Sequence, residues 1–80
     1  IMNYSVRIRL LDSVEGMTND VFSIVTAYAD RRPIKAATIN RGPNEMLESV
    51  EKAKEFASEV GVDSYTFLDK VYNISDETEA

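Results

Sequence analysis

The residue types in this chain restrict the chemistry that it can perform. Its 80 residues contain neither cysteine nor histidine, which excludes thiolate zinc sites, cysteine nucleophiles and histidine-dependent triads. Carboxylates remain, and Asp12 and Glu15 lie beside Gly16 in a segment of loop composition. No partner base or phosphate-binding glycine loop accompanies them. We therefore predict that these acids are solvated, that the chain has no catalytic residue and that it is not an enzyme.

Metal binding by this chain would have to use oxygen ligands alone. Calcium-binding loops place Asp or Asn at alternate positions before a glycine, and the spacing of Asp12, Glu15 and Asp20 does not match this pattern. We therefore expect no metal site and no cofactor.

Charge is distributed unevenly along the chain, whose net charge is −5. Residues 1–42 carry six basic and four acidic side chains, a net of +2, whereas residues 43–80 carry three basic and ten acidic ones, a net of −7. The sequence pI of about 4.6 is far below that of most nucleic-acid-binding domains. The charge balance therefore favours a basic protein partner over direct binding of nucleic acid.

Glutamates recur on the polar face of a helix expected from about Asn44 to Val60. The spacing of Glu48 with Lys52 and of Glu51 with Lys54 stabilises a solvated helix by a few tenths of a kcal/mol per pair, roughly. The alternative interpretation is that the remaining negative stripe docks on a basic surface. The candidate partner-binding residues on this helix are Glu48, Glu51, Glu55 and Glu59.

The segment from Tyr4 to Leu11 alternates apolar and polar residues, which predicts a half-buried strand. Arg7 and Arg9 would then project together from its solvent face. Two like charges on one strand face repel each other, which favours acidic ion-pair partners on a neighbouring strand. Asp69 and Asp30 are the candidate partners. The alternative is a free basic patch, so Arg7 and Arg9 are also candidate partner-binding residues.

The central part of the chain allows more than one interpretation. A loop is expected over Asp12 to Asp20. A strand is expected over Val21 to Ala29, because its β-branched residues favour a strand more than the helical spacing of its apolar residues favours a helix. Arg31 to Arg41 is expected to form a short helix, with a strand over Ile34 to Asn40 as the alternative.

The C-terminal half contains the clearest helix of the sequence. Its apolar residues recur at helical spacing, Asn44 suits the N-cap, and Gly61 and Val62 suit a Schellman motif. Tyr65 to Ile74 is rich in strand formers, with a bulge or turn expected around Asp69 and Lys70.

These elements predict an α+β domain: a single antiparallel β-sheet with helices packed on one face, in the order β-β-α-α-β, whose last strand can fold as a hairpin. The alternative order is β-α-β-α-β. Residues 2–74 would form one domain and residues 75–80 a disordered acidic tail. No apolar stretch has membrane-spanning length, and we expect a cytoplasmic monomer or homodimer.

One segment resembles a known regulatory domain. The run from Leu10 to Met17, followed by Asp20 to Val25, resembles the start of an ACT-type domain, in which a strand ends at an Asp and a Gly before a helix. The resemblance implies a ligand-sensing domain that dimerises and holds a small molecule near Asp12 to Asp20. It also implies that Val21 to Ala29 is a helix.

The whole chain is similar in style to small phage-encoded inhibitors of bacterial defence complexes, of the anti-CRISPR type. The likeness lies in a strand ending Thr26-Ala27-Tyr28-Ala29-Asp30, an alanine-bearing helix and a strand with tyrosine near an acidic end. It implies a non-catalytic, acidic protein-binding module that covers a basic, nucleic-acid-handling surface. That function is our first hypothesis, and the ACT-like sensor is the alternative.

Overall fold

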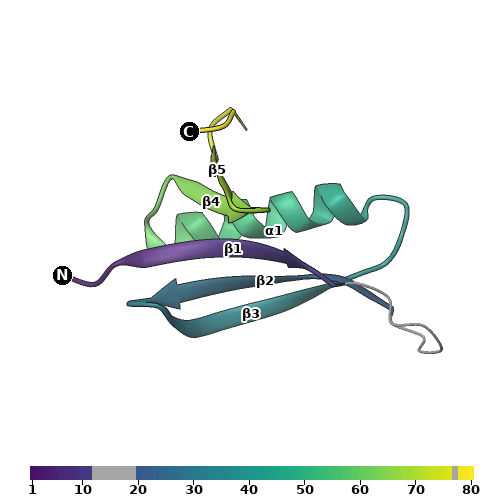
Figure 1. Cartoon of the computed structure of the whole chain (residues 1–80), viewed down its shortest axis with the longest axis horizontal. Helices are drawn as coiled ribbons and strands as arrows, with labels where there is room; N and C mark the ends of the chain where they lie inside the picture. Colours follow the sequence, from purple (N-terminus) through teal and green to yellow (C-terminus); the bar gives the residue numbers. More distant parts are fainter. Residues whose placement is uncertain (12–19, 77) are drawn as a thin grey trace.

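The computed structural model describes residues 1–11, 20–76 and 78–80. Five strands and one helix follow one another along the chain (Figure 1). Their bounds are β1 Tyr4–Leu10, β2 Val21–Ala29, β3 Arg32–Asn40, α1 Glu45–Val60, β4 Ser64–Phe67 and β5 Lys70–Asn73. The expected α+β class is therefore confirmed. The candidate acids Asp12 and Glu15, and the ligand site expected near them, lie outside the described residues.

All five strands form one sheet in the order β3-β2-β1-β4-β5. The pairs β1–β2, β2–β3 and β4–β5 are antiparallel, whereas β1 and β4 are parallel. The expectation of a purely antiparallel sheet is therefore wrong. A parallel pair needs a crossover connection, and α1 is part of the connection that carries the chain from β3 at one edge to β4 beside β1.

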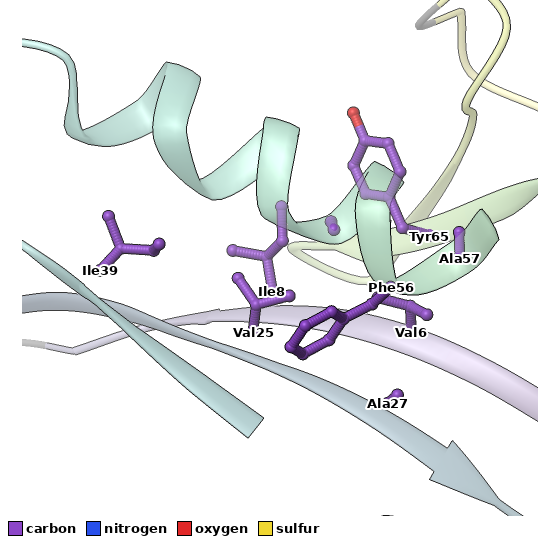
Figure 2. Packing of buried hydrophobic residues seen from close by; sticks show 9 residues of the cluster. Val6, Ile8, Val25, Ala27, Ile39, Phe56, Ala57 and Tyr65 are labelled. Atoms are coloured by element: carbon purple, nitrogen blue, oxygen red, sulfur yellow. The ribbon is translucent and has the colours of Figure 1, made fainter. Parts of the chain in front are cut away.

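The core lies between α1 and one face of the sheet. Alternate residues of β1 and β2 point toward the helix, and Phe56 of α1 packs against them with only 2 % of its surface exposed. Figure 2 shows Val6, Ile8, Val25 and Phe56 in this layer. Full burial of a side chain such as Phe56 contributes about 1.5–3 kcal/mol. The core therefore fixes which face of α1 points outward.

The strand expected over Val21 to Ala29 is confirmed, and with it the β-α-β-α-β alternative is wrong. The short helix expected over Arg31 to Arg41 is also wrong, because β3 occupies this segment. Asp30 and Arg31 connect the two strands with positive φ angles of 49° and 70°, the signature of a two-residue type I′ hairpin turn. The turn brings the segment into a long antiparallel pairing with β2, which outweighs the helix propensity of its alanines.

Helix α1 begins and ends close to the residues expected. Asn44 is the N-cap residue, but its side chain makes no capping hydrogen bond, and the Glu45 carboxylate instead accepts from the Gly42 amide at 3.1 Å. Gly61 has φ 80°, and the amides of Gly61 and Val62 both donate to the Ala57 carbonyl. This is the expected Schellman motif. Within the described ranges, no helix combines the length and apolar character needed to cross a membrane.

The hairpin expected near the C-terminus is formed by β4 and β5. Leu68 and Asp69 make its turn with positive φ angles of 49° and 62°, one position before the turn expected from the sequence. Residues 78–80, which composition predicts to be disordered, lie along β5 in the structure. Glu79 forms a β-bridge with Tyr72, and the Ala80 amide donates to the Val71 carbonyl at 2.7 Å.

Candidate binding surfaces

The candidate residues lie on two opposite sides of the molecule. Arg7 and Arg9 are paired in register with Thr26 and Ile24 of β2 and alternate with the buried Val6 and Ile8 of β1. Side chains directly opposite one another on adjacent strands point to the same face, so both arginines project from the sheet face that α1 leaves uncovered. The glutamates are exposed on α1. The six residues therefore form two surfaces and not one site.

The glutamates of α1 point away from the sheet because the helix buries the opposite side. Ser49, Ala53, Phe56 and Ala57 are its buried residues. We call the exposed set the acidic face; it consists of Glu48, Glu51, Glu55 and Glu59. This confirms that the four residues share the exposed side of the helix, as their spacing predicts.

Two members of the acidic face form ion pairs within the chain. The Lys35 ammonium lies 2.8 Å from a Glu59 carboxylate oxygen, and it also lies 4.9 Å from the centroid of the Phe56 ring. The Lys52 ammonium lies 2.7 Å from the Glu55 carboxylate. Lys52 therefore pairs with Glu55, three residues later, and not with Glu48 as the spacing predicted.

The pair of Lys52 and Glu55 shifts the pKa of both groups. The hydrogen bond to Glu55, followed by its negative charge, raises the pKa of Lys52 above its ordinary value. The same hydrogen bond and the positive charge of Lys52 lower the pKa of Glu55. Because both groups are solvent-exposed, salt screens this interaction strongly. Each charge is largely compensated by its neighbour.

The carboxylates of Glu48 and Glu51 are not compensated by an ion pair, in contrast to those of Glu55 and Glu59, among the described residues. Glu48 and Glu51 both line an open groove of about 590 Å³ between α1 and β3, together with Lys52 and Glu55. The other wall comes from the end of β3 and the connection to the helix, residues 38–44. Sequence reasoning missed this groove, because it exists only once β3 lies at the sheet edge beside α1.

The expected pairing of Arg7 and Arg9 with Asp30 or Asp69 is not formed. Among the residues that the structure describes, neither arginine forms an ion pair. Asp30 instead accepts a hydrogen bond from the Asn3 amide at 3.0 Å. Asp69 lines the same shallow hollow as both arginines without an ion pair to either. Arg7 and Arg9 therefore form a basic patch on the open face.

Sequence reasoning also missed a buried polar contact between the sheet and the helix. Ser23 of β2 and Ser49 of α1 are both 0 % exposed, and their hydroxyl oxygens lie 2.6 Å apart. Ser49 also donates to the Glu45 carbonyl at 2.8 Å. The available signal was the position of Ser49 four residues before the buried Ala53. The contact anchors the helix on the sheet and fixes the direction of its acidic face.

In the described ranges, no group of three or more acids has an arrangement that could hold a metal ion. Comparison with protein-family models, curated proteins and solved structures finds no match to this chain.

Proposed function

We propose that this chain is a non-catalytic protein-binding module that docks the acidic face of α1 on a basic surface of a partner protein. The observation that carries the proposal is the separation of charge across the sheet. The acidic face lies on one side, and Arg7 and Arg9 lie on the other. A partner with a positive surface is attracted to the first side and repelled by the second.

Glu48 and Glu51 supply most of the attraction in this proposal. Both are exposed and without an ion pair among the described residues, so a partner cation does not have to displace an internal one. Complementary charge of this kind accelerates association and selects the orientation of binding more than it adds affinity. Glu59 has a different role, because its ion pair with Lys35 ties the helix to β3.

A basic partner surface of this kind is typical of proteins that handle nucleic acids. Docking of the acidic face would cover that surface and compete with the phosphate backbone. The module would then act as an inhibitor, as its similarity in style to small phage-encoded inhibitors implies. The strand at Val21–Ala29 favours this proposal over the ACT-like alternative, because that resemblance implies a helix in this segment.

The test is capture of partners from an extract of the source cell, or of its host if the source is viral, by the tagged chain. The variant pair Glu48→Lys and Glu51→Lys should lose the partner, whereas Arg7→Ala with Arg9→Ala should retain it. The two pairs compare the two sides of the sheet, because one reverses two exposed charges on the helix and the other neutralises two exposed charges on the open face. Retention by the lysine variant and loss by the alanine variant would contradict the proposal and assign function to the open face.

A further inference from the structure

The two edges of the sheet differ in how the chain protects them. Strand β5, at one edge, has four residues, and the C-terminal residues lie against it through the bridge between Tyr72 and Glu79. The Asn73 amide also donates to the Thr78 carbonyl at 3.0 Å. Strand β3, at the other edge, has nine residues, and no described segment pairs with its outer side (Figure 1). The unprotected edge is therefore β3.

The middle of β3 is suited to accept a further strand. Its register with β2 shifts near both ends but is regular over the five residues from Lys35 to Ile39. The one proline of the strand, Pro33, lies near its start and outside this stretch. Lys35, the only charge in the stretch, is held against Phe56 and Glu59 on the helix side. Natural edge strands are usually blunted by proline, charge or bulges. Strand β3 has such features at Pro33, at Lys35 and at its two register shifts, and Ala36 to Ile39 is the stretch without them.

The groove between α1 and β3 lies directly beside this edge. Thr38 to Asn40 of β3 form one wall of the groove, and Glu48, Glu51 and Glu55 lie along the other. Arg41 and Lys52 also line the groove, and Lys52 is paired with Glu55, so Glu48 and Glu51 are the acids of the groove without an ion pair among the described residues. Ala37 and Ile39 point toward α1, whereas Thr38 points to the open face. A strand added outside β3 would point every second side chain to the helix side, next to the glutamates. Its other side chains would lie beside Thr38 on the open face.

We infer that β3 binds an extended peptide segment of the partner protein as a sixth strand, in which every second residue is Lys or Arg. Backbone hydrogen bonds to β3 would supply affinity, and the alternating basic side chains would be selected by Glu48 and Glu51. This inference rests on the proposed function and names the structure of the segment that the acidic face binds. It differs from simple charge docking because it requires the backbone of β3.

A second copy of the chain fits this edge poorly. Antiparallel pairing of β3 with β3 would create a continuous sheet with its twofold axis perpendicular to the sheet. Both helices would then lie on the same sheet face, with the two acidic faces adjacent along the new junction. Each chain also carries a net charge of −5. Charge repulsion therefore favours a basic occupant over self-association.

The experiment uses two synthetic peptides of identical composition, with lysine and valine either alternating or grouped in separate blocks. Amide chemical shifts of the labelled chain would be followed during titration with each peptide. Alternating lysines should shift the amides of Lys35 to Ile39 and bind at least about fivefold more tightly than the block peptide. Equal affinity for the two peptides, or shifts confined to α1, would overturn the inference.

Proline substitutions separate backbone pairing from charge docking. Successive backbone amides of an edge strand point alternately toward the neighbouring strand and away from it. One of the two variants Ala36→Pro and Ala37→Pro therefore removes an amide that points away from β2, and the pairing of β3 with β2 persists in that variant. Circular dichroism identifies the folded variant, which should bind the alternating peptide at least about tenfold more weakly. As a comparison, Glu48→Gln with Glu51→Gln should lose about three- to tenfold at low salt.

The outcomes distinguish the inference from the proposed function. If the glutamine pair weakens binding and the folded proline variant does not, charge docking stands and strand addition is refuted. If neither affects binding, both are refuted. Dimerisation of the free chain in sedimentation, abolished by the same proline variant, would also overturn the inference by assigning the edge to a second copy.

Discussion

The buried contact between Ser23 and Ser49 offers a sharp test of how α1 is held on the sheet. The Ser49 hydroxyl has one proton, which it donates to the Glu45 carbonyl at 2.8 Å. The Ser23 hydroxyl, 2.6 Å from the Ser49 oxygen, must therefore be the donor in the contact between them. The two serines thus have unequal roles.

The unequal roles predict unequal costs on substitution. Ser49→Ala leaves a buried hydroxyl donor on Ser23 without a partner, which costs about 1–3 kcal/mol in the free energy of unfolding. The gain in helix propensity returns at most about 0.5 kcal/mol. Ser23→Ala leaves the Ser49 hydroxyl bonded to Glu45 and should cost about 0.5–1 kcal/mol. The double variant has no orphaned donor, so it should be more stable than the sum of the single changes implies, by about 1 kcal/mol.

Urea denaturation followed by far-ultraviolet circular dichroism measures these four free energies. Ser58→Ala is the matched control, because Ser58 is exposed on the same helix and reports helix propensity alone. After correction with this control, Ser49→Ala should lower the free energy of unfolding by about 1–3 kcal/mol, and a thermal scan should show a melting temperature lower by roughly 4–24 °C. Additive effects of Ser23→Ala and Ser49→Ala, or a larger cost for Ser23→Ala, would refute the assignment of donor and acceptor.

Three further predictions concern the turn, an ion pair and the open face. Asp69→Gly should stabilise the domain by about 0.5–1 kcal/mol in urea denaturation, because Asp69 has φ 62°, and a loss of stability would contradict this. Because Lys52 lowers the pKa of Glu55, the ion pair stabilises the fold at pH values above the ordinary carboxyl pKa, and this contribution is lost as the pH falls through the lowered pKa. The variant Lys52→Met should restore the ordinary pKa of Glu55 in a carboxyl NMR titration. An unchanged pKa of Glu55 would refute the pairing. Arg7→Ala with Arg9→Ala should change the melting temperature by less than about 3 °C, because neither arginine forms an ion pair with a described acid; a larger loss would show structural pairing.

Elements whose signal is local were predictable from the sequence. The signals are the alternation in β1, the β-branched residues of β2 and the apolar periodicity of α1, and each lies within one segment. The backbone conformation of each of these three segments agrees with its signal. Strand β3 was mispredicted because its pairing is decided by a turn at Asp30 and Arg31. Type I′ turns favour Asn-Gly or Asp-Gly, so Asp30 fits the first position, but Arg31 occupies the second position, where glycine is expected.

Features that depend on distant segments could not be predicted. The parallel pairing of β1 with β4 joins residues such as Ile8 and Phe67, and no local pattern encodes it. The exposure of the acidic face followed from helix periodicity alone. The compensation of Glu59 by Lys35 did not, because those residues lie 24 positions apart and meet only after β3 packs beside α1.

The proposed function requires that the acidic face of α1 contacts a basic partner. The most direct measurement is the association rate constant of the captured partner at low and high salt. Glu48→Lys with Glu51→Lys should reduce this rate at least about tenfold at low salt and much less at high salt. Arg7→Ala with Arg9→Ala should leave it unchanged. An association rate that is insensitive to both salt and the glutamate reversals would contradict the proposed function.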